Sequence, residues 1–353
     1  MEAEPVQFLW RNYEDRLEPA RAEVARFIGA SPKDLVFVTN ATTGLNAVLS
    51  SYSFKAGDEI LTTNHDYNAC HNVLVETARR AGARLVVARV PFPVRDADQI
   101  LEVILDSVTA RTRLAMIDHV TSTTALVFPV SKIVLELERR GVDTVVDGAH
   151  APGMVPLNLS RLAPAYYAAN LHKWVCAPKG AAFLWVREDK QSLIQPAVIS
   201  HGNNTAKPGY SSFQDRFDWA GTFDPSAWFC AGEAIQWMEK LLPGGWPAIR
   251  AINHRLVARA RTLLCHKLEL DSPCPLSLLG SMATLPLPER FQGRLKSGKI
   301  DLEQCRLYDQ FGIEVPFYRF GQPEKRWFRI SAQLYNSIAD YEFLAQALAC
   351  LKI

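Results

Sequence analysis

The sequence has no apolar run that approaches the roughly 18–20 residues needed to cross a membrane. Its first residues, MEAEPVQFLWRNYEDR, lack the basic and then apolar order of a secretory signal peptide. The formal net charge is only +2, so the basic excess typical of nucleic-acid binding is also missing. These absences predict a cytoplasmic protein with neither a membrane nor a nucleic-acid partner.

Paired cysteines are missing as well. The seven cysteines are odd in number and include no CxxC pair. This pattern argues against a disulfide framework and against a structural zinc site. We therefore expect reduced thiols in a protein that holds no metal.

What the sequence does contain is an alternation of short apolar runs with helix-like segments. Strands of this length, separated by helices of about ten residues or more, are typical of a mostly parallel sheet with helices on both faces. The sequence therefore predicts an α/β fold. The expected strands are residues 35–38, 59–63, 84–88, 113–118 and 143–147, and the expected helices are residues 43–51, 68–81, 97–107 and 130–140.

Several apolar runs end in a polar residue, namely Asn40, Asp118, Asp147 and Asn170. Ligands of open α/β sheets bind outside the carboxyl ends of the strands. We therefore expect a binding site at this edge of the sheet.

The pattern changes near residue 245, where LLPGGW interrupts it. A helix, two strand-like runs and a last helix are expected beyond it, over 247–270, 281–286, 327–331 and 339–352. We predict a large α/β domain over residues 1–245 and a smaller α+β domain over residues 246–353.

Three motifs place polar groups where a ligand would use them. In VDGAH, Asp147 ends an apolar strand, where a buried carboxylate needs a cationic partner, although a plain turn residue is the alternative. In NLHKW, Lys173 has apolar neighbours that would lower its pKa, although a surface lysine is the alternative. In VTNATTGLNAV, hydroxyls and free amides meet at a helix N-terminus, which suits a phosphate or a simple helix cap.

The order of the three motifs is more informative than any one of them. A phosphate cup comes first, then a carboxylate, then a lysine 26 positions after that carboxylate (147 to 173). The cup lacks the lysine of a nucleotide P-loop, which argues against ATP. A phosphorylated aromatic cofactor with a basic ring nitrogen and an aldehyde needs these three partners.

Seven stretches distributed over nearly the whole chain match one known family. They are FVTNATTGLNAVL, DEILTTNHDYNAC, MIDHVTSTTALVFPV, VDGAHAPGMVPLNL, ANLHKWVCAPKGAAFLWV, FDWAGTFDPSAW and FRISAQLYNSIADY. In them the chain resembles the class V aminotransferases, which are pyridoxal-phosphate-dependent enzymes of fold type I. The most similar branch is that of isopenicillin N epimerase, which also includes C–S lyases such as hercynylcysteine sulfoxide lyase.

The resemblance implies pyridoxal 5'-phosphate as the cofactor. Lys173 would form the Schiff base and shuttle the α-proton, and Asp147 would keep the pyridine nitrogen protonated. His150 would hydrogen-bond the ring hydroxyl, and His119 would stack on the pyridine face as a further catalytic residue. The phosphate ligands implied by the resemblance are Thr42 and Thr43, with His172 and Asn170 nearby.

The resemblance also implies a substrate side and a partner subunit. Arg329, in FRIS, would clamp the substrate carboxylate, a task that suits the bidentate guanidinium. Tyr67 and Asn68 would contact the substrate. Thr222, in WAGT, would reach the phosphate site of the other subunit, so that a homodimer with shared active sites is expected.

The chain departs from the family pattern in two places. Cysteine desulfurases carry a nucleophilic cysteine shortly before the arginine, and residues 312–328 contain none, so no desulfurase activity is expected. Relatives begin with a segment resembling NHGxFG that lines the substrate pocket, and this sequence is expected to start downstream of it.

The expected function is therefore a reaction at Cα of an amino acid. A lyase that expels a β-thiol or sulfenate from a cysteine-derived substrate needs one base, Lys173. An epimerase needs a second proton donor, for which His119 and Tyr67 are the candidates. A transaminase is a third possibility, and a homologue that keeps the fold as a binding partner without catalysis is a fourth.

Overall fold

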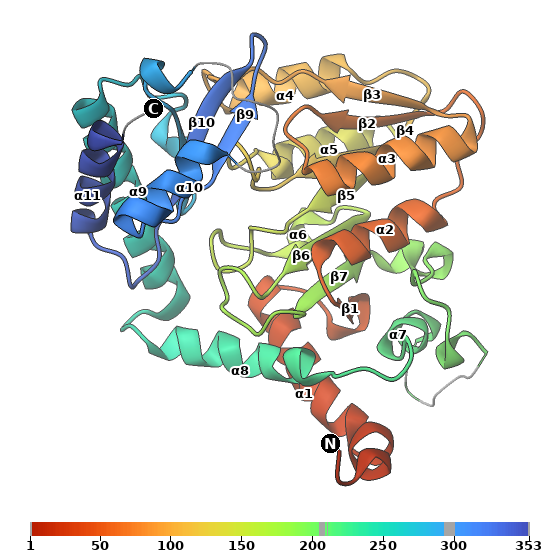
Figure 1. Cartoon of the computed structure of the whole chain (residues 1–353). Coiled ribbons are helices and arrows are strands. Elements are labelled where there is room, and N and C mark those ends of the chain that lie inside the picture. The colour runs from red at the N-terminus through yellow and green to blue at the C-terminus, as the bar shows by residue number, and fades with distance from the viewer. Residues whose placement is uncertain (1, 205–208, 210, 293–300, 352–353) are drawn as a thin grey trace.

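A seven-stranded sheet forms the centre of the computed structural model, which describes residues 2–204, 209, 211–292 and 301–351 (Figure 1). Its strands are β1 (Leu35–Val38), β2 (Glu59–Thr63), β3 (Arg84–Ala88), β4 (Thr112–Asp118), β5 (Asp143–Asp147), β6 (Tyr166–Asn170) and β7 (Ala182–Val186). They lie in the order β1-β7-β6-β5-β4-β2-β3. The strands β2 to β6 run parallel, and β7 is antiparallel to both of its neighbours. The prediction of a mostly parallel α/β sheet is confirmed.

Helices cover both faces of this sheet. They are α1 (Tyr13–Ile28), α2 (Ala41–Ser51), α3 (Asn68–Ala81), α4 (Ala97–Asp106), α5 (Val130–Arg139), α6 (Leu159–Leu162), α7 (Ser212–Asp218) and α8 (Ser226–Lys240). Successive side chains of a strand point to opposite faces. Met116 and Val145 therefore pack with α2 and α3, whereas Ile117 and Val146 belong to the larger core beneath α1, α5 and α8.

The C-terminal part forms a second, antiparallel sheet in the order β8-β10-β9. Its elements are α9 (Gly245–Leu268), β8 (Met282–Pro286), α10 (Leu302–Phe311), β9 (Phe317–Phe320), β10 (Lys325–Ser331) and α11 (Ile338–Cys350). Figure 1 shows these elements, coloured teal to dark blue, to one side of the large sheet. The Thr284 hydroxyl donates to the Thr123 carbonyl at 2.8 Å, and one hydrophobic core extends across residue 245. The domain boundary at 245 stays a prediction.

A buried ion pair fastens α1 to the sheet. The guanidinium of Arg21 is fully buried, lies 2.7 Å from an Asp218 carboxylate oxygen, and donates to the Leu35 carbonyl at 2.7 Å. Asp218 ends α7, directly before the segment that carries Thr222. Through this pair, α1, β1 and the start of that segment are held as one unit.

Membrane spans, metal sites and disulfides, which the sequence argues against, can be looked for in the part of the chain that the structure describes. Within it, no helix is both long and apolar enough to span a membrane. In the same part of the chain, no three His, Cys, Asp or Glu side chains are arranged so that they could hold a metal ion. All seven cysteines lie in described positions, and each is a free thiol.

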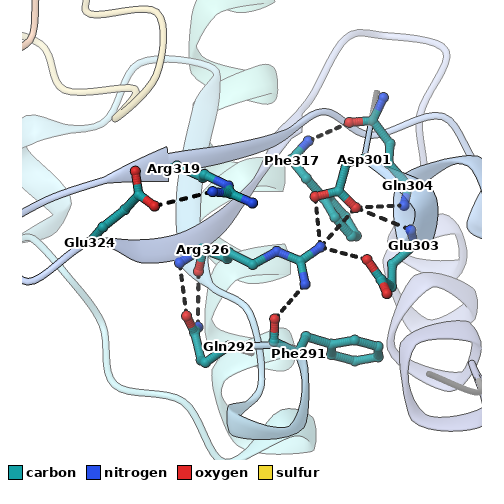
Figure 2. A network of polar contacts seen from close by, with 9 residues as sticks. All are labelled: Phe291, Gln292, Asp301, Glu303, Gln304, Phe317, Arg319, Glu324 and Arg326. Carbon is teal, nitrogen blue, oxygen red and sulfur yellow. Dashed lines mark hydrogen bonds and ion pairs between the residues drawn. The ribbon is translucent and has the colours of Figure 1, made fainter. Parts of the chain in front are cut away.

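A network of polar contacts around Arg326 ties the small sheet to α10 (Figure 2). Arg326 is 6% exposed, and its Nη2 lies 2.6 Å from Asp301 and 2.9 Å from Glu303. Asp301 also caps α10 by accepting from the Gln304 amide at 3.2 Å. Gln292 bonds both the amide and the carbonyl of Arg326. One cation thus neutralises two carboxylates at the start of α10.

We predict that Arg326→Met destabilises the protein by about 3–5 kcal/mol, because it leaves two carboxylates in a buried place without a cation. Arg319→Met is the matched control, since Arg319 pairs with Glu324 at 3.3 Å on the surface, with 45% and 61% of the two side chains exposed. That loss should stay below about 1 kcal/mol. Urea unfolding of both variants measures the difference, and equal losses would contradict the role assigned to Arg326.

Candidate active site

Three polar side chains meet at the carboxyl edge of the large sheet. Asp118, Asp147 and Asn170 end the neighbouring strands β4, β5 and β6. Each lies two residues beyond a side chain that packs with α2 and α3, so all three face that same side. The sequence prediction of a polar edge is confirmed, and the edge is covered by the helices that follow β1 and β2.

Asp147 is 4% exposed and receives two hydrogen bonds. The Ala149 amide donates to its Oδ1 at 2.9 Å, and the Cys70 thiol donates to its Oδ2 at 3.4 Å. Burial raises the pKa of Asp147, while the Ala149 amide and the charge of Lys173 act in the opposite direction. The carboxylate is therefore held away from water, where a cation beside it would be strongly attracted.

Lys173 lies in the loop between β6 and β7, with its Nζ 3.1 Å from His150 Nε2. Burial lowers the pKa of Lys173 to about 8, with Asp147 opposing that shift and Arg329 adding to it. The Trp174 indole donates to His150 Nδ1 at 3.4 Å, and an indole N–H can only donate, so a neutral His150 carries its proton on Nε2. In that tautomer the N–H faces Lys173, which can accept it only in the neutral amine form that the lowered pKa makes accessible. The pKa of His150 is lowered well below its usual range by burial and by the charges of Lys173 and Arg329.

The N-terminus of α2 forms the expected cup. Asn40 caps the helix by accepting from the Thr43 amide at 2.8 Å, and Asn170 accepts from the Ala41 amide at 2.8 Å. Among the described residues, the amide of Thr42 has no acceptor. Free amides and hydroxyls at a helix N-terminus favour an anion there. In this arrangement Asn170 positions α2, and its predicted contact with the cofactor stays a prediction, as do those of Thr42 and Thr43.

His172 and His119 flank this region. His172 Nδ1 is buried without a hydrogen-bond partner among the described residues, and burial lowers the pKa of this histidine. His119 is buried on the other side of the sheet edge, where its Nδ1 lies 2.8 Å from the Tyr167 hydroxyl. Burial lowers the pKa of His119 to about 4, so its imidazole is neutral at ordinary pH.

Gly148 is required by the position of Tyr167. A Cβ on Gly148 would lie 2.1 Å from Tyr167 Cε1, a distance that no side chain tolerates. Tyr167 in turn is fully buried, and its hydroxyl fixes the ring of His119. The glycine in VDGAH therefore makes room for the side chain that orients His119.

Arg329 approaches the same edge from β10. Its guanidinium donates to the Ser122 carbonyl and to the Ser122 hydroxyl, and it lies 5.4 Å from the centre of the Tyr318 ring. Its Nε is buried without a partner among the described residues, and burial lowers its pKa. The structure thus brings Arg329 close enough to influence both Lys173 and His150, with donors left for a ligand.

The remaining predicted residues lie on exposed segments. Tyr67 is 49% exposed and Asn68 is exposed, both at the start of α3, one turn before Cys70. Thr222 is exposed between α7 and α8. The structure brings Lys173, His150, Asp147 and Arg329 together. The substrate role of Tyr67 and Asn68 and the partner contact of Thr222 stay predictions.

No sequence motif singles out Cys70, Tyr167 or Ser122. In the sequence Cys70 is one of seven expected core thiols, and Tyr167 lies inside an apolar strand. The nearest sequence signal for Tyr167 is the glycine after Asp147, because such a glycine indicates a close approach by another group. The sequence predicts Asp118 as a polar strand end and assigns it no further role.

Comparison with known proteins identifies the family of the chain. A family model described as aminotransferase class-V matches residues 7–270. Isopenicillin N epimerase from Streptomyces clavuligerus is 34% identical over 365 residues, covering 99% of this chain and 88% of that protein. L-cysteine desulfhydrase from Arabidopsis thaliana is 27% identical over 374 residues, covering 98% of this chain and 81% of that one.

Solved structures agree in fold. The apo structure of cysteine desulfurase from Thermococcus onnurineus NA1 matches with a TM-score of 0.78 at 22% identity, over 96% of this chain and 84% of that one. The seven-stranded sheet with a small antiparallel C-terminal sheet is therefore the fold type I architecture expected from the sequence. Because the family model spans most of the chain and a relative above 30% identity spans nearly all of it, the chain belongs to the class V aminotransferase family.

Proposed function

We propose that the protein is a pyridoxal-phosphate-dependent lyase that removes a sulfur group from Cβ of a cysteine-derived amino acid. The observation that supports this most is the buried Lys173 amine, whose pKa is about 8 and whose neighbours are His150, Asp147 and Arg329. A neutral lysine amine beside a buried carboxylate and an arginine suits covalent attachment of an aldehyde and binding of an amino acid.

The described residues fit this cofactor part by part. Asp147 is a buried carboxylate that suits a protonated ring nitrogen. The N-terminus of α2, with its free Thr42 amide, suits the phosphate. His172 has a buried ring nitrogen that still needs a partner. Bound there, pyridoxal phosphate would supply an electron-withdrawing ring that stabilises negative charge at the substrate Cα.

Each of the chain's own groups then has one task. Lys173 would take the proton from Cα, because a pKa of about 8 leaves much of its amine neutral near pH 8 and His150 contacts it at 3.1 Å. Arg329 would bind the substrate carboxylate through the guanidinium N–H groups, Nε–H among them, that do not donate to Ser122. Asp147 would hold the proton on the ring nitrogen of the cofactor. His119, a neutral imidazole fixed by Tyr167, would pack against the ring.

The protonation properties of Lys173 and His119 favour elimination over epimerisation. An epimerase delivers protons to both faces of Cα and needs a second group that changes its protonation state. His119 has a pKa of about 4 and its Nδ1 is engaged with Tyr167, which makes it a poor donor at neutral pH. Lys173, by contrast, has a pKa of about 8, which lies near neutral pH, where a base can both take up and release a proton. One-base chemistry agrees with the activity named for the Arabidopsis relative.

Epimerisation is the second candidate, supported by the 34% identity to the Streptomyces isopenicillin N epimerase. Tyr67, half-exposed at the start of α3, would then be the second donor. Transamination shares the first steps. The joint presence of Lys173, Asp147, His150 and Arg329 argues against a homologue that has lost catalysis.

We expect incubation with L-cysteine and its S-conjugates to give pyruvate and a released thiol or sulfide in equal amounts, because one base suffices for β-elimination. Lys173→Ala should abolish the reaction and the borohydride-stable cofactor adduct, whereas the exposed Lys132→Ala should keep both. Exchange of the α-hydrogen in heavy water without pyruvate would contradict the lyase and support the epimerase or the transaminase. A reduced adduct on another lysine would remove Lys173 from its role.

Asp147→Asn should lower turnover at least about a hundredfold with saturating cofactor. The substitution keeps the shape that the Ala149 amide contacts and removes the charge, and about two pKa units on the ring nitrogen correspond to roughly 2.7 kcal/mol. Steady-state kinetics measures the loss. Asp98→Asn, which removes a surface carboxylate paired with Lys132, is the control. Near-normal turnover of Asp147→Asn would exclude the carboxylate from the mechanism.

We also propose a homodimer in which Thr222 completes the phosphate site of the partner subunit. Trp219 is a poor probe of this, because its ring packs 5.7 Å from that of Tyr13 in its own chain. Thr222→Asp is better, since the side chain is exposed and the new charge would repel the phosphate. Cofactor affinity should fall at least about tenfold, while Thr262→Asp on α9 leaves it unchanged. A sedimenting monomer with full cofactor occupancy would contradict the shared site.

A further inference from the structure

Asp118 is a buried carboxyl group for which the proposed reaction has no task. It ends β4 directly beside Asp147, with which it is paired in the register of the two parallel strands. Only 3% of it is exposed. Its Oδ2 is buried and has no hydrogen-bond partner among the described residues. Side chains paired in this way point to the same face of the sheet, so two carboxyl groups share one buried region.

The charged and titratable groups around Asp118 come from each element packed against it. Asp147 faces it from β5, Asp66 from the segment before α3, Cys70 from α3, and Lys173 from the loop after β6. Asp66 itself is paired with His71 at 2.9 Å. The region thus holds three carboxyl groups and one lysine. Adjacent buried carboxyl groups do not both ionise, because each charge disfavours the other.

The hydrogen-bond donors decide which carboxyl group keeps the proton. Asp147 accepts from the Ala149 amide and the Cys70 thiol, and Asp66 accepts from the Thr62 hydroxyl and pairs with His71. Donors stabilise the ionised form of a carboxyl group. The free oxygen of Asp118 has none. Burial and the charges of Asp147 and Asp66 accordingly raise the pKa of Asp118 well above its usual range.

We propose that Asp118 is a protonated carboxylic acid in the folded protein and acts as a positioning residue that leaves Asp147 as the charged member of the pair. An ionised Asp118 would push a proton onto Asp147 and weaken the group that faces the cofactor ring nitrogen. The protonated state of Asp118 is inferred from the protein's own contacts alone. Its positioning role rests on the proposed function, because that function supplies the ring nitrogen that Asp147 would face.

Infrared spectroscopy of the full-length protein tests the proton directly. At about pH 8, where exposed aspartates are fully ionised, the wild type should show the C=O band of a protonated carboxyl group that shifts when aspartate is labelled with carbon-13. The band should be missing in Asp118→Asn and present in Asp66→Asn, the matched control from the same cluster. A wild type without such a band, or a band that survives in Asp118→Asn, would overturn the proposal. Where Asp118→Asn does not fold, a wild type without the band still overturns the proposal, and a band that persists in Asp66→Asn removes Asp66 as its source.

The pH dependence of stability is a second readout. A carboxyl group with a raised pKa in the folded state holds a proton that the unfolded chain releases above about pH 4, so its contribution to stability is lost as pH rises. Asp118→Asn removes this loss. Its melting temperature relative to the wild type should therefore climb from about pH 5 to about pH 8. The surface variant Asp98→Asn should show no such slope, and a flat difference for Asp118→Asn would contradict the proposal.

The task of Asp118 is tested by substitution with its neutral isostere. Asp118→Asn mimics the protonated acid, so cofactor affinity and turnover should stay within about threefold of the wild type, and the pH profile of the bound cofactor's absorption should not shift. A loss of more than about tenfold would show that a charge at Asp118 is needed and would sink the proposal. This outcome is separate from the proposed lyase reaction, since the infrared band and the stability slope do not depend on the substrate.

Discussion

The site depends on one constraint, which is that a carboxylate at the end of β5 must be kept out of water and still remain charged. Asp147 is buried, and its desolvation disfavours the charge. The structure offsets this with the Ala149 amide, the Cys70 thiol and the nearby Lys173. Such a group is costly for folding alone, because a buried ionised carboxylate without a full cationic partner is destabilising. The protonated ring nitrogen of the proposed cofactor would be a cation that offsets this cost.

The glycine after Asp147 connects this carboxylate to the opposite side of the sheet edge. Without a side chain at 148, the ring of Tyr167 occupies the space above the backbone and its hydroxyl reaches His119. The backbone amide of His119 donates to the Asp147 carbonyl at 2.8 Å. Movement of β5 would therefore displace the carboxylate and the imidazole together. The two groups that are proposed to contact the cofactor ring, Asp147 and His119, are thus held by one short piece of backbone.

The sequence was sufficient for the elements and for the polar strand ends, because both depend on local periodicity. Five of the seven strands of the large sheet were expected within one residue of their observed bounds. The helix α1 was not, since it is rich in charged residues and contains Pro19. The antiparallel direction of β7 and the pairing of Asp118 with Asp147 depend on strand order, which no local pattern encodes. For the same reason Lys173 could be located from its motif, whereas the partners that lower its pKa could not.

The small C-terminal sheet is coupled to the site through the loop that follows β4. His119 opens this loop and Ser122 lies within it, so that the loop touches Tyr167 at the edge of the large sheet on one side and Arg329 on the other. Thr284 of β8 bonds the Thr123 carbonyl, and Leu278 accepts from the Val127 amide at 2.9 Å. Arg329, the proposed substrate clamp, is therefore positioned against the same loop that begins with His119. Because the loop contacts both the small sheet and the edge of the large one, a change in the packing of the C-terminal sheet would move Arg329 relative to His119, so the small sheet helps to set the geometry of the candidate site.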